Sequence, residues 1–181
     1  MINIKQSQTI KDVFTVEFQF HADERGRFHE MFRKKWFPQR TWNIIQMNRS
    51  DSQAGVLRGL HYHHHQVDYW YVIQGSMRAG LADIRPESAT YLAQQVIDIN
   101  EDNRIGLFIP IGVAHGFFAL TEVSLMYVVD NYYDGTDEHG VAWNDPQLNV
   151  NWGIENPIIS KRDMGNPFLK DIPPENLGAV K

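Results

Sequence analysis

The chain has 181 residues, which suits one domain because domains usually hold roughly 100–200 residues. It contains no cysteine, which excludes disulfides and a thiol nucleophile and is typical of a reducing compartment. Its formal net charge of -5 argues against a general nucleic-acid-binding protein, which normally carries a basic face. The sequence has no signal core and no apolar run of ~20 residues. We therefore expect a single cytoplasmic domain over residues 1–181, without nucleic-acid or membrane partners.

Most predicted elements are strands. Apolar side chains alternate with polar ones over Asp12–His21, which predicts a half-buried strand, and Glu30–Phe37 is amphipathic and predicts a short helix that ends before Pro38. Further strands are predicted over Trp42–Met47, Asp68–Ile73, Met77–Ile84, Tyr91–Ile99, Arg104–Ile109, Gly116–Leu120 and Val123–Tyr132. Turn residues such as Gln74-Gly75-Ser76 separate them. Many short strands at regular spacing predict an all-β sandwich or barrel with a few short helices.

Histidines are the densest chemical signal, since four of the five residues from His61 to His65 are His. On a strand, His61, His63 and His65 would share one face. Another, His115, follows Pro110 and Gly112, whose turn delivers it to the start of a strand. A His-rich surface loop or a satisfied core histidine is the alternative interpretation.

The spacing of these residues resembles the two motifs of the cupin superfamily. The first motif matches Gly55, His61, His63, Asp68 and Gly75, with Asp68 where Glu is usual. The core of the second matches the segment ending at His115, although Ala119 stands where Asn is expected. The resemblance implies a jelly roll, also called a double-stranded β-helix. In metal-dependent cupins the equivalents of His61, His63, Asp68 and His115 bind one cation, and imidazole with carboxylate suits Fe, Mn, Ni or Zn.

A closer resemblance covers nearly the whole chain. Seven short strings occur in order: Asp23-Glu24-Arg25-Gly26, Gln46-Met47-Asn48, Gly55-Val56-Leu57-Arg58-Gly59-Leu60-His61-Tyr62, Asp83-Ile84-Arg85, Ala114-His115-Gly116-Phe117, Trp143-Asn144-Asp145 and Ser160-Lys161-Arg162-Asp163. This set is similar to the dTDP-4-dehydrorhamnose 3,5-epimerase family, which acts on nucleotide-linked 4-keto-6-deoxy sugars. Each string alone is unremarkable, whereas the collinear set is specific.

The resemblance implies a catalytic role for three residues. Epimerisation needs a base that removes a proton alpha to the sugar ketone and an acid that returns one to the opposite face. The family's base matches His61, and an imidazole is suitable because its unperturbed pKa of about 6.5 is close to working pH. A carboxylate that orients this ring matches Asp163, and the proton donor matches Tyr127.

The resemblance also implies substrate-binding residues. The nucleotide contacts match Arg25, Glu30, Gln46 and Asn48, with Tyr133 stacking on the base. Contacts to the diphosphate or sugar match Arg58, His115 and Arg162, and Glu138 matches a further acid of the substrate site. Guanidinium groups suit paired phosphate oxygens because they offer a planar fork of donors. Taken alone, each arginine would be read as a solvated surface charge.

The chain departs from the family at Asp68. The family has a Lys there, near the keto group, and the segment between His61 and Gly75 is about three residues shorter than usual. An anion thus replaces a cation that could stabilise the enolate, and losing one such donor can cost about 3 kcal/mol. Either another group, such as His63, takes over, or Asp68 completes a metal site. Because a metal-bound His61 would have no free lone pair, we favour a site without metal or other cofactor.

The prediction is therefore a jelly-roll epimerase that converts dTDP-4-dehydro-6-deoxyglucose to dTDP-4-dehydrorhamnose. The alternatives are a single-carbon epimerase for another nucleotide sugar, a metal-dependent cupin enzyme, and a catalytically silent sugar-nucleotide-binding module. Members of the family are typically homodimers, so we expect a homodimer, with Asp12–His21 as a plausible strand for pairing across the interface.

Overall fold

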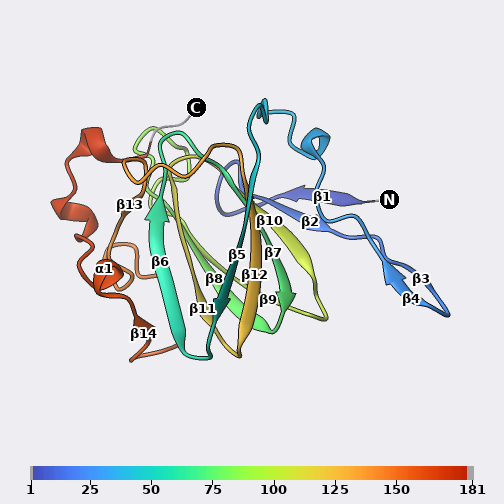
Figure 1. Cartoon of the computed structure of the whole chain (residues 1–181). Helices are drawn as coiled ribbons and strands as arrows, with labels where there is room; N and C mark the ends of the chain where they lie inside the picture. Colours follow the sequence, from blue (N-terminus) through green and yellow to red (C-terminus); the bar gives the residue numbers. More distant parts are fainter. Residues whose placement is uncertain (1, 179–181) are drawn as a thin grey trace.

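The computed structural model describes residues 2–178 and consists mainly of antiparallel strands (Figure 1). One six-stranded sheet has the order β1-β2-β10-β7-β12-β5. Its strands are β1 (Asn3–Gln6), β2 (Phe14–Glu17), β10 (Ile105–Ile109), β7 (Asp68–Gln74), β12 (Val123–Val129) and β5 (Gln46–Ser52). The second sheet has the order β13-β6-β11-β8-β9, with β14 pairing in parallel with β6. Its strands are β13 (His139–Gly140), β6 (Val56–Tyr62), β11 (Val113–Ala119), β8 (Ser76–Asp83), β9 (Gln94–Asn100) and β14 (Ile158–Ile159).

The two sheets pack face to face over a shared apolar core. Trp70 of β7 meets Phe117 of β11 across the gap, with ring centroids 5.9 Å apart, and Leu81 and Leu125 are also buried there. This core occupies one part of the space between the sheets and leaves the rest for a cavity, as in small jelly rolls.

The carboxyl-terminal segment covers the outer face of the second sheet (Figure 1). It carries helix α1 (Lys161–Met164) and the 3₁₀ turns η2 (Leu169–Asp171) and η3 (Pro174–Asn176). Trp152 lies directly on Gly80 of β8, where an added Cβ would come within 2.5 Å of the indole ring. Because both faces of β11 are covered, all seven of its residues are buried. The second sheet is thus a rigid wall between the cavity and the carboxyl-terminal layer.

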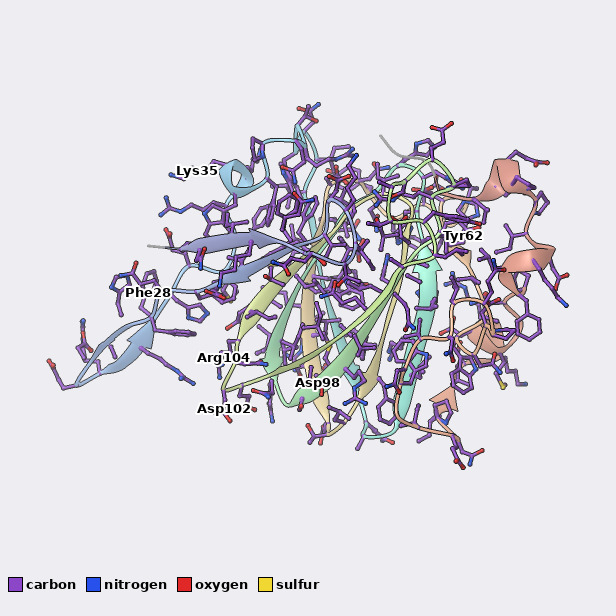
Figure 2. All side chains as sticks on the ribbon, turned by 180° about the vertical axis from the view of Figure 1, so that it is seen from behind. Phe28, Lys35, Tyr62, Asp98, Asp102 and Arg104 are labelled. Carbon is purple, nitrogen blue, oxygen red and sulfur yellow. The ribbon has the colours of Figure 1, made fainter. Side chains whose placement is uncertain are left out.

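Aromatic side chains of the amino-terminal region cover the first sheet. Phe37 stacks on Phe108 of β10 at 4.4 Å between ring centroids, and Trp42 is buried beside them. The short hairpin of β3 (His21–Asp23) and β4 (Gly26–Phe28) projects away from both sheets (Figures 1 and 2). Phe28 on this hairpin is 67% exposed.

The all-β jelly roll predicted from the sequence is confirmed, and most of the predicted strands correspond to β2 and β7–β12. The strand expected over Trp42–Met47 is wrong, because Trp42 has a φ of 51° and the strand begins at Gln46. The helix expected over Glu30–Phe37 is reduced to the 3₁₀ turn η1 (Lys34–Trp36). Strand β6 was not predicted, and it ends at Tyr62, so His63 and His65 lie in the following turn.

The strand expected over Asp12–His21 is shorter, comprising only Phe14–Glu17. It is also an inner strand, hydrogen-bonded to β1 on one side and β10 on the other. The backbone of Phe14–Glu17 is therefore already paired on both sides, and pairing of this region with a second subunit stays a prediction. Among residues 2–178, no helix has the length and apolar character needed to span a bilayer.

Candidate active site

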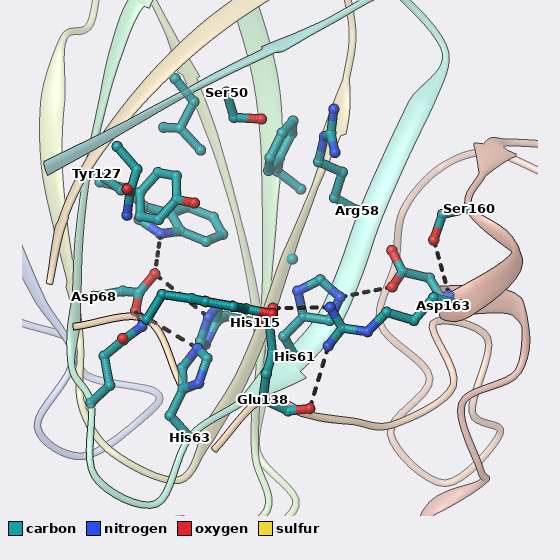
Figure 3. Close-up of a pocket in the computed structure, with 18 of the residues that line it drawn as sticks. Ser50, Arg58, His61, His63, Asp68, His115, Tyr127, Glu138, Ser160 and Asp163 are labelled. Carbon is teal, nitrogen blue, oxygen red and sulfur yellow. Dashed lines mark hydrogen bonds and ion pairs between the residues drawn. The ribbon is translucent and has the colours of Figure 1, made fainter. Parts of the chain in front are cut away.

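A cavity of about 490 Å³ opens between the two sheets. Strands β5, β7 and β12 of the first sheet and β6 and β11 of the second line it, together with the loop after β12 and the start of the carboxyl-terminal layer (Figure 3). Its volume lies in the range of pockets that bind small molecules. The polar side chains converging there make it the candidate active site.

An imidazole–carboxylate pair lies in the wall of this cavity. His61 of β6 and Asp163 of α1 are joined by a hydrogen bond of 2.8 Å between Nε2 and Oδ1. The carboxylate only accepts, so Nε2 carries the proton and the lone pair of the neutral ring is on Nδ1. The sequence-predicted pairing of a ring with a carboxylate 102 residues downstream is present in the structure.

Backbone contacts fix the position of Asp163. The second carboxylate oxygen accepts the Gly59 N–H at 3.2 Å, and Ser160 caps α1 by accepting the Asp163 N–H at 3.0 Å. Burial alone would raise the pKa of Asp163, but the hydrogen bond and charge of His61 and the Gly59 N–H hold it below its usual value. Asp163 is therefore an anion at neutral pH and stabilises a protonated His61 ring.

Gly59 allows strand β6 to lie close to its neighbour, strand β11. Its φ is 123°, and an added Cβ would lie 2.6 Å from the Gly116 Cα of the neighbouring strand β11. A side chain at position 59 would therefore be strained and would also push β6 away from β11.

Tyr127 of β12 enters the cavity from the opposite sheet (Figure 3). Burial raises its pKa above the usual phenol value, and the nearby carboxylates Asp68 and Glu138 raise it further. Arg58 acts in the opposite direction but does not outweigh them. The phenol consequently keeps its proton at neutral pH and can serve as a proton donor.

Two of the predicted arginines line the cavity. Arg58 of β6 is held by hydrogen bonds to the Ser52 hydroxyl and the Asp51 carbonyl, at 3.0 and 3.3 Å. Arg162 forms an ion pair with Glu138, with 3.1 Å between Nη1 and Oε1. About half of the Arg162 side chain is exposed, so it can turn toward an anionic ligand at little cost.

The predicted nucleotide contacts separate into two groups. Gln46 and Asn48 of β5 line the cavity and are bonded to each other at 2.9 Å, and Tyr133 stands at the cavity wall with its ring 70% exposed. Arg25 and Glu30 do not line this cavity. Arg25 is on the projecting hairpin, where it pairs with Asp23, and Glu30 follows the hairpin and pairs with Arg33.

Asp68, the residue at which the chain differs from the family, lies in the wall of the cavity beside two histidines. His63, Asp68 and His115 are all buried, and their side-chain ligand atoms lie within 4.8 Å of one another (Figure 3). Burial lowers the pKa of His115 to about 4, although the charge of Asp68 opposes this. His61 is not a member of this group. Of the four residues in the metal-dependent alternative, the structure therefore brings three together and leaves the fourth with Asp163.

Several supporting residues were not predicted. Gln66 and Trp70 each donate a hydrogen bond to Asp68 at 3.0 Å, and the carbonyl of Asp137 accepts from His63 at 2.8 Å. Only Ser160 has a local signal, because Ser followed by an acidic residue three positions later is typical of a capped helix start. Gln66 and Trp70 are each two residues from Asp68 but carry no motif that marks them, and the contact of His63 with Asp137 joins segments 74 residues apart.

The fold and site together define a cupin-type jelly-roll protein with an acid–base site in its cavity. The family model described as dTDP-4-dehydrorhamnose 3,5-epimerase matches residues 7–171. The chain therefore belongs to the dTDP-4-dehydrorhamnose 3,5-epimerase family, as its sequence strings predicted.

Individual relatives are similar to this chain over most of their length. The chain is 35% identical over 168 residues to the dTDP-4-dehydrorhamnose 3,5-epimerase of Shigella flexneri, covering 88% of this chain and 93% of that one. Among solved structures, the dTDP-6-deoxy-D-glucose-3,5-epimerase of Legionella pneumophila, in complex with dTDP-4-keto-L-rhamnose, has a TM-score of 0.91 at 31% identity, covering 100% of both chains. A 3'-monoepimerase of Streptomyces bikiniensis, in complex with dTDP-quinovose, has a TM-score of 0.85 at 28% identity, covering 92% and 88%.

Proposed function

We propose that this protein is an epimerase of nucleotide-linked 4-keto-6-deoxy sugars that converts dTDP-4-dehydro-6-deoxyglucose to dTDP-4-dehydrorhamnose. The observation that carries the proposal is the 2.8 Å bond between His61 and Asp163 in the wall of a cavity large enough for a sugar nucleotide. Family membership supports the same reaction.

His61 is the general base in this proposal. Its Nδ1 lone pair removes the proton alpha to the ketone, and Asp163 stabilises the imidazolium that forms. Removal leaves an enolate, in which the former C–H electron pair is shared with the keto oxygen. Tyr127 enters the cavity from the opposite sheet, so it can return a proton to the other face of the same carbon. Delivery from the other face inverts the configuration.

In this proposal, the other polar side chains that line the cavity bind the nucleotide, the diphosphate and the sugar. Arg58 and Arg162 supply positive charge for the diphosphate, and His115 and Glu138 supply further polar contacts to the sugar. Gln46, Asn48 and Tyr133 are suited to the thymine base through amide hydrogen bonds and ring stacking.

We also propose a homodimer, in which Arg25 and Glu30 reach the cavity of the partner subunit. Both match nucleotide contacts of the family, yet neither lines the cavity of its own chain. The projecting hairpin and its exposed Phe28 support this arrangement. The single domain over residues 1–181 and the cytoplasmic location stay predictions.

The experiment is incubation with dTDP-4-dehydro-6-deoxyglucose in heavy water, followed by NMR of the sugar protons. We expect deuterium at carbons 3 and 5 with the wild-type protein, and its loss with His61→Ala because the base is missing. A general base contributes about 10²–10⁴-fold. Full exchange by His61→Ala would contradict the assigned base.

The same spectra separate the related alternatives. Deuterium at one carbon only would identify a single-carbon epimerase, as in the Streptomyces bikiniensis relative named for one position. Tight binding of the sugar nucleotide without any exchange would identify a binding module and contradict the proposed activity.

A further inference from the structure

Three buried side chains in the cavity wall present hydrogen-bond acceptors to one another (Figure 3). The His63 Nδ1 lies 2.8 Å from the Asp137 carbonyl, and the His115 Nδ1 lies 2.9 Å from the Val113 carbonyl. A carbonyl only accepts, so in both neutral rings Nδ1 carries the proton and Nε2 carries the lone pair. Both Nε2 atoms face the carboxylate of Asp68. We call these two Nε2 atoms and the Asp68 carboxylate the acceptor cluster.

The Asp68 carboxylate gives the acceptor cluster a negative charge. Gln66 donates a hydrogen bond to one of its oxygens and the Trp70 indole to the other, each at 3.0 Å, and such donors favour the ionised form. Within the part of the chain that the structure describes, no Lys or Arg forms an ion pair with Asp68. Because a buried charge without a counter-charge is costly, a ligand that brings a positive charge here would be stabilised.

The spacing of the acceptor cluster fits a single donor group placed among its members. Each Nε2 is 3.9 Å from an oxygen of Asp68, which is too far for a direct hydrogen bond. One nitrogen or oxygen of each side chain lies within 4.8 Å of the others. Acceptors that surround one nitrogen at hydrogen-bond distance lie ~4–5 Å apart, so all three can reach the same donor.

The donors and the charge of a primary ammonium group match those of the acceptor cluster. Such a group has three N–H donors, no acceptor and one positive charge, and the cluster has three acceptors and one negative charge. A sugar hydroxyl has one donor and lone pairs of its own, so it would leave two of the acceptors without a partner. A keto oxygen only accepts and would be repelled. Where the family has a Lys, the chain has Asp68, so the ammonium must here come from the ligand.

The acceptor cluster lies beside the proposed base and the proposed acid. His115 of β11 is opposite His61 of β6 in the strand register. Trp70, which donates to Asp68, is likewise opposite Tyr127 of β12. A group bound by the cluster therefore belongs to the sugar ring, close to the carbons at which protons are removed and returned, rather than to the thymine base.

We propose that the acceptor cluster binds a primary ammonium group, and that the cavity accepts nucleotide-linked 4-keto-6-deoxy sugars in which an amino group replaces the hydroxyl at carbon 2 or 3. These two carbons are the ring positions that still carry a hydroxyl in such a sugar. The inference rests on the proposed function, which places the sugar of a sugar nucleotide in this cavity. The amino sugar makes a charged contact that the hydroxy sugar lacks, so it should bind more tightly.

The test compares ligands that differ in one group and cannot react. Full-length protein is titrated by calorimetry at pH 7 with dTDP-6-deoxyglucose and with its 2-amino-2-deoxy and 3-amino-3-deoxy counterparts. A chelator in the buffer keeps metal ions out of the cluster, and the hydroxyl at carbon 4 replaces the ketone so that no proton is removed. We expect one of the amino ligands to bind at least about 10-fold more tightly than the hydroxy ligand, because hydrogen bonds between charged groups are the stronger ones. Methylammonium alone should bind far more weakly, since it lacks the nucleotide.

A variant identifies the charge that is responsible. Asp68→Asn keeps the size of the side chain but removes its charge, so the preference for the amino ligand should fall from about 10-fold to nearly none. Asp134→Asn is the matched control, because it makes the same change at an exposed carboxylate that also lines the cavity. Circular dichroism checks that both variants are folded, and the ligand comparison on the wild-type protein needs no variant.

Equal affinity of the wild-type protein for all three sugar nucleotides would overturn the proposal, as would a preference that folded Asp68→Asn keeps or that Asp134→Asn loses equally. Methylammonium bound as tightly as the amino ligands would assign the cluster to free amines and overturn the proposed class of sugar. Deuterium exchange tests the proposed function separately. A preference for the amino ligand without any exchange would contradict the proposed activity and leave the ammonium site intact, and exchange without the preference would do the reverse.

Discussion

The imidazole–carboxylate pair shows what short sequence motifs can predict about individual residues. His61 and Asp163 were matched from short strings, and the structure places them 2.8 Å apart. Arg25 and Glu30 were matched in the same way and lie outside the cavity of their own chain. A motif identifies a residue type at a position, but it does not say whether the side chain reaches the cavity of its own chain.

Replacing Tyr127 by Phe separates proton removal from proton return. Tyr127→Phe removes the donor but leaves His61 and Asp163 in place, so the base can still remove a proton and return deuterium to the same face. We expect deuterium uptake without inversion, and product formation that is lower by about 10²-fold or more. NMR of the sugar measures both quantities in one sample.

The control for this variant is Tyr91→Phe, which removes an exposed phenol that does not line the cavity. Equal formation of the inverted product by Tyr127→Phe and the wild type would show that another group donates the proton.

Strands with an apolar inward face were predicted well from sequence, including the cavity-lining β7, β11 and β12, whereas the cavity-lining strands β5 and β6 were not. In β5, the inward side chains Gln46, Asn48 and Ser50 are polar because they face the cavity, so the expected apolar alternation is absent. Strand β6 contains Gly59, and its side chains Arg58 and His61 are polar because they also face the cavity. The two strands that sequence periodicity misses therefore both contribute polar side chains to the cavity.

The turn after β8 contains a buried ion pair that stabilises this end of the sheet. Asp83 and Arg85 are at most 2% exposed, and Asp83 accepts hydrogen bonds from Arg85, Ser88 and Thr90. Burial alone would raise the pKa of Asp83, but these donors lower it below the usual value.

We expect Asp83→Asn to lower the free energy of unfolding by about 3 kcal/mol, because Arg85 then loses its buried counter-charge and keeps only the more exposed Asp12, 3.6 Å away. Urea denaturation at pH 7 measures this change. Asp98→Asn, which removes the exposed partner of Arg78, is the control and should cost less than about 1 kcal/mol.

The pH dependence of the Asp83 effect follows from the same pKa. Because the pKa of Asp83 is lower in the folded state than in the unfolded state, its contribution is fully present above the unfolded value of about 3.9. It is lost as the pH falls through the folded value. The difference between wild type and Asp83→Asn should therefore narrow below about pH 4, and a constant difference down to pH 2 would contradict this account.

At the scale of the whole molecule, the projecting hairpin predicts a shared active site. If Arg25 acts in the partner's cavity, Arg25→Ala and His61→Ala subunits complement each other, because a mixed dimer contains one intact site. Random pairing of the two in a symmetric dimer would restore about one quarter of the wild-type sites.

Co-expression of the two variants with different affinity tags, followed by double purification, isolates the mixed dimer. One of its two sites is intact, so the exchange assay on this sample should recover about one half of the wild-type activity per site. Sedimentation equilibrium gives the mass of the same sample. A monomeric mass, or no activity in the purified mixed dimer, would contradict the shared site.

Because Asp163 follows His61 in the chain, the ribosome synthesises the carboxylate after the imidazole with which it pairs. Translation delivers the amino-terminal part first, and the carboxylate is encoded 102 codons after the imidazole that it orients. A nascent chain on the ribosome therefore carries the His61 imidazole long before Asp163 can bond to it. Premature stop codons anywhere upstream of position 163 would yield products that lack the orienting carboxylate, however many of the sheets they contain.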